Sequence, residues 1–269
     1  MATNLYFKQI SKQPNMLIRL FLVISVFVFS ILFSFYSVSS QANTLADDTK
    51  INTPAIIMGY YSQWSIYSPN IHVQDLQAHF MTHLVYKSAY LSGDGTIKLG
   101  DAFADIEHLY PTVNIEEEAI LGSFGQLIKL KKQQPNLKNI ISIGGWGRSE
   151  NFSVLTSTDA GRKKIAKSAV EFMRKYKFDG IEIDWQFPIY RTISATKPLV
   201  FNQQSDPLHL GLLMQEIKLQ CALVSENCWL QVILAPYSID EIEHINLVDS
   251  NTDVVVVDIS RIYGDKENL

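Results

Sequence analysis

The stretch of sequence that decides the fold is Phe178-Asp179-Gly180-Ile181-Glu182-Ile183-Asp184-Trp185-Gln186-Phe187-Pro188. Side chains on a β-strand point alternately to its two faces, so a strand here gathers its polar residues on one face and its large apolar residues on the other. The polar row is Glu182, Asp184 and Gln186. Its members stand about 7 Å apart along the strand.

Two carboxylates on one face of a buried strand raise the pKa of one of them, because like charges in a confined site disfavour double ionisation. We therefore interpret Glu182 and Asp184 as parts of a functional site. The alternative is an edge strand with a solvated acidic face. The apolar residues that flank the row favour a strand that is buried on both faces.

Outward from this stretch, strand-like apolar runs alternate with amphipathic helical runs, which is typical of βαβ units. The expected strands are 55–61, 82–87, 139–143, 179–186, 229–235 and 253–259. The expected helices are 124–134, 159–177 with Asp159 as N-cap, and 208–224. This order predicts an α/β fold, a (β/α)8 TIM barrel.

A full barrel of this kind has eight strands in about 250 residues. Here the chain stops ten residues after the sixth expected strand, so we expect a barrel that is truncated after about six units and a chain that is a fragment. The alternative is an open, doubly wound sheet, but no Gly-rich phosphate loop follows the first strand. A truncated barrel leaves open strand edges, which predicts self-association.

The quoted stretch resembles the fourth-strand motif of glycoside hydrolase family 18, the chitinases and their relatives, which reads Asp-Gly-x-Asp-x-Asp-Trp-Glu-Tyr-Pro. The matching residues are Asp179, Gly180, Asp184, Trp185 and Pro188. Glu182 replaces an Asp, Phe187 replaces a Tyr, and Gln186 stands where the family has its catalytic Glu.

The resemblance extends over most of the chain after the leader. Residues 142–146, Ser-Ile-Gly-Gly-Trp, match the family's Ser-x-Gly-Gly pattern. Residues 58–61 with Trp64 resemble its first strand, residues 82–86 its second, and residues 122–127 the entry to the helix before the third. The sixth strand departs from the family, because Ser260 and Arg261 stand in place of the usual Tyr and Asp.

The resemblance implies a substrate-assisted reaction, in which the sugar's own N-acetyl group attacks and forms an oxazolinium ion. Asp184 would orient the acetamido group, and Glu182 would support Asp184 by sharing a proton. Gln186 has no proton to give near neutral pH. Because general acid catalysis typically contributes 10²–10⁴-fold, we expect hydrolysis to be impaired or lost.

Nine residues form the candidate site. The catalytic positions are Asp179, Glu182, Asp184 and Gln186, and the substrate-binding positions are Tyr60, Trp64, Gly144, Gly145 and Trp146. The aromatic residues could stack on sugar faces, whereas Trp185, which points away from the polar row, is expected in the core. No cofactor and no metal is implied, since two cysteines without a nearby histidine do not make a closed zinc shell.

The function that this combination predicts is a secreted chitinase-like protein that binds chitin or N-acetylglucosamine oligosaccharides. One alternative is an active chitinase that uses another acid, for instance Glu182 or a loop residue. A second is a lectin-like or scaffolding module without chemistry, and a third is the remnant of a longer gene.

The first 42 residues read as a secretory signal, in which three basic residues precede an apolar run at 20–36 and a small-residue cleavage site ends at Ala42. The alternative is an uncleaved membrane anchor. Residues 43–269 then form the barrel domain. The leader has three basic and no acidic residues, so its removal takes the net charge from −4 to −7. This negative charge argues against a nucleic-acid partner.

The two cysteines, Cys221 and Cys228, are seven positions apart. In an exported protein this spacing permits a disulfide, if the residues between them turn from a helix into a strand.

Overall fold

The computed structural model describes residues 55–110, 120–185, 205–224, 227–234 and 245–257. All the helices and strands below belong to one compact unit of the chain. The proposed signal or anchor lies outside the described residues, as do Gln186, Ser260 and Arg261. Among the residues that the structure does describe, no helix is long and apolar enough to cross a membrane.

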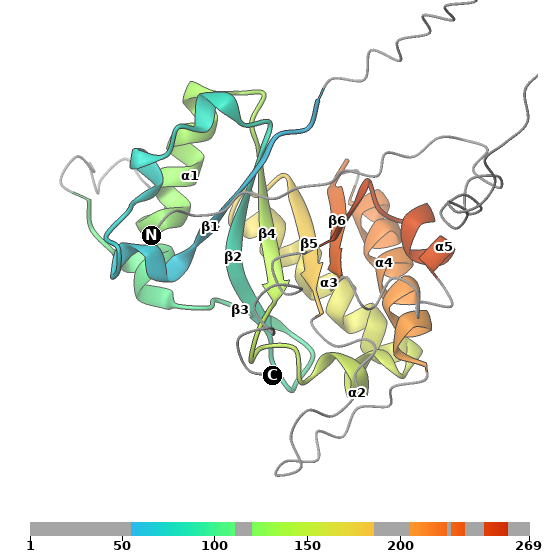
Figure 1. Cartoon of the computed structure of the whole chain (residues 1–269). Coiled ribbons are helices and arrows are strands. Elements are labelled where there is room, and N and C mark those ends of the chain that lie inside the picture. Colours follow the sequence, from blue (N-terminus) through green and yellow to red (C-terminus); the bar gives the residue numbers. More distant parts are fainter. Residues whose placement is uncertain (1–54, 111–119, 186–204, 225–226, 235–244, 258–269) are drawn as a thin grey trace, which may run out of the picture. The chain divides into compact units, whose positions relative to one another are not determined.

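Six parallel strands follow one another across the sheet in chain order (Figure 1). They are β1 (Met58–Ser62), β2 (His83–Leu91), β4 (Lys138–Gly144), β5 (Gly180–Asp184), β6 (Trp229–Leu234) and β7 (Val254–Val257). All six expected strands are confirmed, with ends that differ by a few residues. A doubly wound sheet would reverse its strand order at a switch point. This order has no reversal and is that of a (β/α)8 barrel.

One strand was not expected from the sequence. β3 (Ile97–Lys98) pairs antiparallel with the far end of β2, with Leu91 opposite Ile97. β2 itself runs four residues beyond its predicted end at Lys87. Two residues are too few for an alternating pattern to be visible, so the sequence carries no periodic signal for β3.

Along the chain, the α-helices connect successive strands from β3 onward. They are α1 (Gly122–Gln133), α2 (Phe152–Thr156), α3 (Asp159–Lys175), α4 (Asp206–Leu223) and α5 (Ile245–Ser250). Short 3-10 turns follow β1, at 63–66, 73–75 and 78–80, and a π-helical turn spans 103–107. The two short helices, α2 and α5, were not predicted.

The expected N-cap of α3 is wrong by one residue. Thr158 has the extended backbone of a cap, and its side-chain oxygen accepts a hydrogen bond from the Gly161 amide at 3.1 Å. Asp159 is the first helical residue, and it pairs instead with Lys163 at 2.7 Å. A carboxylate in the first turn also interacts favourably with the helix dipole.

The sheet has apolar residues on both of its faces, so it is buried on both. The cluster shared with the helices includes Ile141, Ile143, Ile181, Ile183 and Trp185. The cluster on the other face consists of Met58, Val85, Ile140, Ile233, Val254 and Val256. The solvated edge-strand interpretation of β5 is therefore excluded. Trp185 lies in the core as predicted, stacked on Phe152 with ring centroids 5.4 Å apart.

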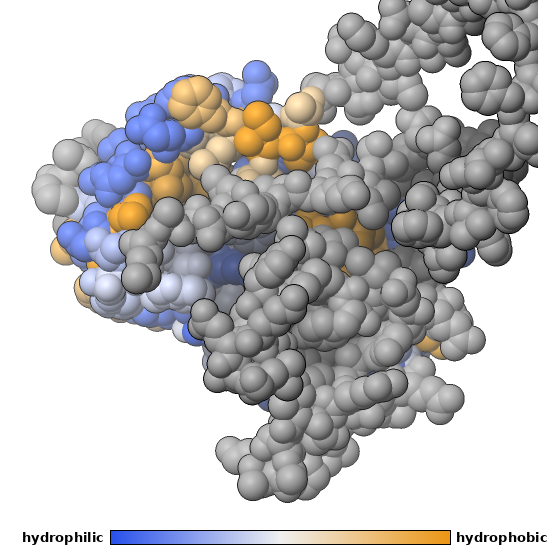
Figure 2. Space-filling model, viewed as in Figure 1, coloured by the Kyte–Doolittle hydropathy of each residue, from blue (hydrophilic) through white to orange (hydrophobic). Residues whose placement is uncertain are grey.

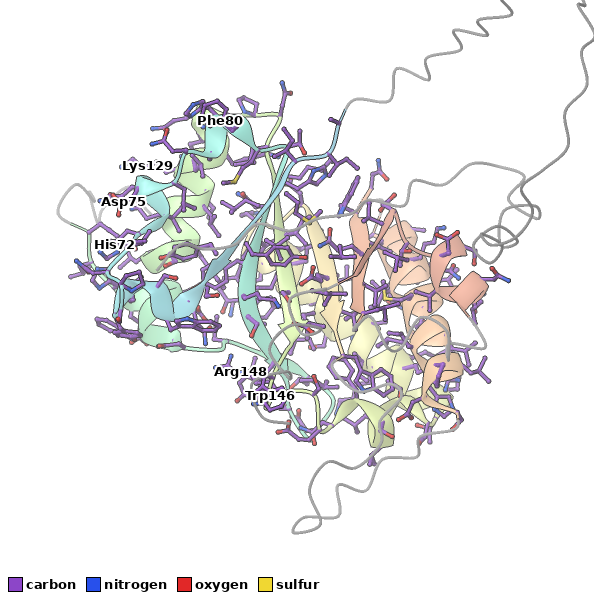
Figure 3. The ribbon with its side chains drawn as sticks, viewed as in Figure 1. His72, Asp75, Phe80, Lys129, Trp146 and Arg148 are labelled. Atoms are coloured by element: carbon purple, nitrogen blue, oxygen red, sulfur yellow. A yellow bond between two sulfur atoms is a disulfide. The ribbon has the colours of Figure 1, made fainter. Side chains whose placement is uncertain are left out.

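Figure 2 shows hydrophilic and apolar residues mixed on the described surface near β1 and α1. Phe80, labelled in Figure 3, is among the exposed apolar side chains, with two thirds of its surface accessible. Single exposed apolar residues are ordinary on a folded protein. This surface therefore does not by itself indicate a binding site.

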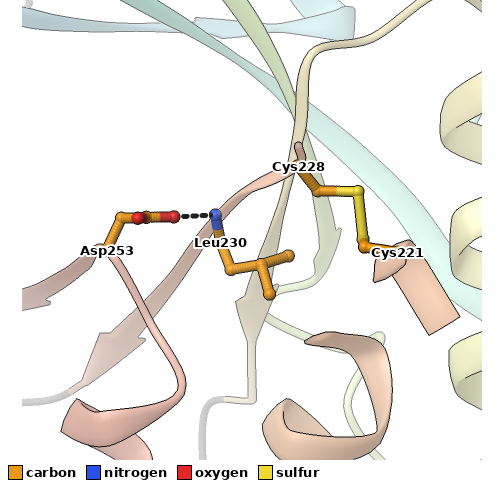
Figure 4. Close-up of a disulfide and its surroundings, with 4 residues drawn as sticks. All are labelled: Cys221, Cys228, Leu230 and Asp253. Carbon is orange, nitrogen blue, oxygen red and sulfur yellow. Dashed lines mark hydrogen bonds between the residues drawn. A yellow bond between two sulfur atoms is a disulfide. The ribbon is translucent and has the colours of Figure 1, made fainter. Parts of the chain in front are cut away.

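The disulfide that the cysteine spacing permits is formed (Figure 4). It joins Cys221 in the last turn of α4 to Cys228 just before β6. Beside it, a carboxylate oxygen of Asp253 accepts a hydrogen bond from the Leu230 amide at 2.7 Å. The bridge closes the connection between α4 and β6, and the Asp253 bond ties the start of β7 to β6.

Candidate active site

Glu182 and Asp184 lie on β5 and point to the same side of the sheet, opposite the helix-facing cluster. Both are buried, with 0% and 1% of their surface exposed. Glu182 Oε2 accepts a hydrogen bond from the Tyr60 hydroxyl at 2.6 Å and another from Gln231 Nε2 at 2.5 Å. Tyr60 comes from β1 and Gln231 from β6, so side chains from both sides of β5 hold this carboxyl group.

Burial raises the pKa of Glu182, because the charged form loses its hydration. The nearby Lys87 ammonium lowers this pKa, the Asp184 charge raises it, and the Tyr60 hydrogen bond lowers it. The net effect is a pKa above the ordinary range of a glutamic acid. Glu182 is thus a carboxyl group that retains its proton more readily than a solvated one.

Asp184 is paired with a lysine that sequence reasoning missed. Lys87 Nζ lies 2.8 Å from Asp184 Oδ2. Lys87 is on β2 and shares a strand face with Val85, two residues earlier. Val85 belongs to the apolar cluster on the sheet face that points away from the helices. The signal was a lone lysine near the end of an apolar strand. Such a residue ordinarily indicates the end of a buried run. Only the fold brings its side chain to Asp184 of β5, two strands away in the sheet.

The backbone of Asp184 is held at the carboxyl end of β4. Its carbonyl oxygen accepts hydrogen bonds from the Gly145 amide at 2.8 Å and from the Ser149 hydroxyl at 3.0 Å. Gly144 has φ +106°, and a Cβ atom there would lie 2.5 Å from the same carbonyl oxygen. Glycine is therefore required for the close approach of β4 and β5. This positioning role explains Gly144, and contact of either Gly144 or Gly145 with a sugar stays a prediction.

Asp179 lies apart from Glu182 and Asp184, and its catalytic role stays a prediction. It precedes β5 at the amino end, where it pairs with Lys131 Nζ at 2.9 Å and accepts a hydrogen bond from the Asn139 amide at 2.8 Å. Asp184 is five positions further along the extended strand, a distance of about 17 Å. Its contacts join α1, β4 and β5.

The predicted aromatic residues lie in three different settings. Tyr60 is partly buried and its hydroxyl is on Glu182. Trp64, in the 3-10 turn after β1, is 56% exposed, and Trp146, directly after Gly145, is 80% exposed. Figure 3 shows Trp146 beyond the carboxyl end of β4, close to Arg148. An indole ring is large and apolar enough to stack on a ligand, and contact of either tryptophan with a sugar stays a prediction.

Arg148 fixes the loop beside these residues. Its guanidinium donates to the Ser88 carbonyl at 2.9 Å and to the Gly100 carbonyl at 3.3 Å. With its amide oriented to satisfy its neighbours, Gln63 donates to Ser88 and accepts from Arg148. The end of β2 is thereby tied to the loops that follow β1 and β4. No group of three or more His, Cys, Asp or Glu side chains that could hold a metal occurs among the described residues.

The sequence of this chain is similar to a known family and to individual members of it. Residues 56–268 match the family described as glycosyl hydrolases family 18. Endochitinase 1 of Metarhizium robertsii is 36% identical over 177 residues, which covers 61% of this chain and 42% of that protein. The chain thus spans less than half the length of this relative.

Two solved structures are similar in fold. A chitinase from Bacillus thuringiensis has a TM-score of 0.67 and 26% identity, and the match covers 74% of this chain and 38% of that one. The catalytic domain of a psychrophilic chitinase B from Arthrobacter TAD20 has a TM-score of 0.68 and 23% identity, with coverage of 76% and 58%. The second likeness is one of fold alone.

Proposed function

This chain belongs to the glycosyl hydrolases of family 18, and on that premise we propose that it binds chitin or N-acetylglucosamine oligosaccharides and hydrolyses them poorly or not at all. The observation that carries the proposal is the buried pair of Glu182 and Asp184 on β5, held at the carboxyl end of the sheet. Asp184 is the residue that we assign to the acetamido group of the sugar.

Gln186, which stands where the family has its catalytic Glu, supports the loss of hydrolysis. A carboxamide can hydrogen-bond a glycosidic oxygen, but it cannot transfer a proton to the leaving group, and a positioned acid is worth 10²–10⁴-fold. Ser260, at the place of the family's usual tyrosine, has too short a side chain to replace a phenol. Both changes leave the aromatic binding positions Trp64 and Trp146 intact.

The competing hypothesis is an active chitinase that uses Glu182 as its acid. In its favour, burial raises the pKa of this carboxyl group, as a general acid requires. Against it, Glu182 is fully buried, and its Oε2 is occupied by Tyr60 and Gln231. An acid must reach the glycosidic oxygen within hydrogen-bonding distance. An enclosed carboxyl group suits the support of Asp184 better than proton delivery.

The test compares binding with turnover in the same preparation. We expect calorimetry to detect binding of an N-acetylglucosamine oligosaccharide, while a fluorogenic chitobiose assay gives a rate at least about 100-fold below that of an intact family member. Gln186→Glu should raise the rate without a matching change in affinity. A wild-type rate within tenfold of an active chitinase would contradict the proposal. Absence of binding would favour a scaffolding module or a remnant.

We also propose export by residues 1–42, followed by self-association of the barrel domain, residues 43–269. Among the described strands, β1 hydrogen-bonds only to β2, and β7 only to β6. β7 is the apolar, β-branched run Val254–Val257, a type of edge that pairs readily with another chain. N-terminal sequencing of secreted protein and size-exclusion chromatography test the two points. Retention of residues 20–36, or a monodisperse monomer, would contradict them.

A further inference from the structure

A lysine ammonium lies in the candidate site, where the cationic oxazolinium ion of the family reaction would be stabilised by negative charge. Lys87 Nζ is 2.8 Å from Asp184 Oδ2 and 5.4 Å from the centroid of the Tyr60 ring. The Lys87 side chain is 21% exposed and that of Asp184 is 1% exposed. The pair is thus shielded from water, and salt screens a shielded pair much less than a surface one.

The backbone around Lys87 is held by the neighbouring strand and loop. Lys87 lies on β2, opposite Ser62 of β1 in the parallel register. The carbonyl of the next residue, Ser88, accepts a hydrogen bond from Arg148 at 2.9 Å. These contacts hold the backbone from which the Lys87 side chain extends, and from there its ammonium reaches Asp184 Oδ2 at 2.8 Å. Its pairing with Asp184 therefore links β2 to β5.

The charge of the ammonium has a direct consequence for ligands. Asp184 without a counter-ion would attract a cation at the sugar's amino position. With Lys87 beside it, that attraction is offset by repulsion between two positive charges. Unit charges a few ångströms apart interact strongly at the effective dielectric constant of a partly buried site. A neutral acetamido group loses nothing by the presence of Lys87, whereas a free ammonium group does.

We propose that Lys87 makes this site select N-acetylated, neutral amino sugars over deacetylated, cationic ones. The inference rests on the proposed function, since it concerns the specificity of the same sugar site. It also accounts for a binding protein more readily than for a hydrolase, because the oxazolinium ion of the family reaction is itself cationic. Lys87 acts as a specificity-determining residue through its charge and requires no chemical step of its own.

The experiment measures two affinities by calorimetry at pH 6, where the amine of a glucosamine sugar is charged. The ligands are the N-acetylglucosamine trisaccharide and the glucosamine trisaccharide. The selectivity is the affinity for the acetylated trisaccharide divided by the affinity for the glucosamine trisaccharide. For Lys87→Met we expect this ratio to fall about tenfold or more, mainly because the cationic ligand binds more tightly. Lys87→Gln removes the charge but keeps a hydrogen-bond donor, and should give the same direction if the Met variant does not fold.

The matched control is Lys98→Met, which removes an exposed lysine of β3 and should leave the ratio unchanged. A second readout needs no ligand. The Lys87 charge lowers the pKa of Glu182, so the titration of Glu182, followed by carbon NMR, should move to higher pH in both Lys87 variants and stay in place in the control.

The outcomes separate the inference from the function on which it rests. Binding of the acetylated ligand with an unchanged ratio in the Lys87 variants would overturn the role of Lys87 and leave the proposed function standing. An unchanged Glu182 titration would show that the ammonium does not lie in the site, and would also overturn it. Failure of wild-type protein to bind either sugar would overturn the proposed function, and the selectivity with it.

Discussion

Removal of the Tyr60 hydroxyl by Tyr60→Phe should destabilise the protein by an amount that increases with pH. The hydroxyl donates to Glu182 Oε2 at 2.6 Å, and the carboxyl group is fully buried. A hydrogen bond to a charged group is worth about 1.5–3 kcal/mol, and one to a neutral group about 0.5–1.5 kcal/mol. We therefore expect a cost of about 1 kcal/mol where Glu182 is protonated and about 2 kcal/mol where it is ionised.

The sign of the pH dependence follows from linkage. Burial raises the pKa of Glu182 in the folded state above its unfolded value, so the folded state holds the proton more tightly. Stability is then fully present below the unfolded pKa, and this contribution falls as the pH rises through the interval up to the folded pKa. The Tyr60 hydrogen bond lowers the folded pKa and limits that fall. Tyr60→Phe should make the fall larger.

Urea unfolding at pH 4, 6 and 8 measures the effect. The control is Tyr67→Phe, which removes a hydroxyl that donates to Asp101 at 2.8 Å in an exposed pair. Surface changes of this kind usually stay within about 0.5 kcal/mol. A cost of Tyr60→Phe that is the same at all three pH values, or no greater than that of the control, would refute the assignment of Glu182 as a buried, hydrogen-bonded acid.

Two further predictions concern the frame of the site. Gly144→Ala should cost about 2 kcal/mol or more beyond Gly147→Ala. Both glycines have positive φ, but a Cβ atom at 144 would lie 2.5 Å from a backbone carbonyl, while one at 147 would meet nothing within 4 Å; equal costs by thermal unfolding would contradict this. Replacing Cys221 and Cys228 by alanine should lower the unfolding free energy by about 2.5 kcal/mol, from the entropy of closing a short loop. Denaturant titration would measure it, and no loss would mean that the bridge does not constrain the unfolded chain.

The sequence alone was enough to predict most of the fold. Apolar runs separated by helical runs predicted all six parallel strands, because a strand that is buried on both faces is apolar on both. It did not predict β3, α2 or α5, which are too short for a periodic pattern. The cap of α3 was misplaced by one residue because Thr158 and Asp159 are both good capping types, and only the backbone conformation decides between them.

For the site, the sequence by itself determined that Glu182 and Asp184 share one face of a buried strand, since that follows from alternation within a single segment. It could not separate them from Asp179, whose place at the amino end of β5 depends on where the strand begins. Nor could it find Lys87. A salt bridge between β2 and β5 joins residues almost a hundred positions apart, and which side chains meet across a sheet is set by strand register. That register comes from tertiary packing, which no local pattern encodes.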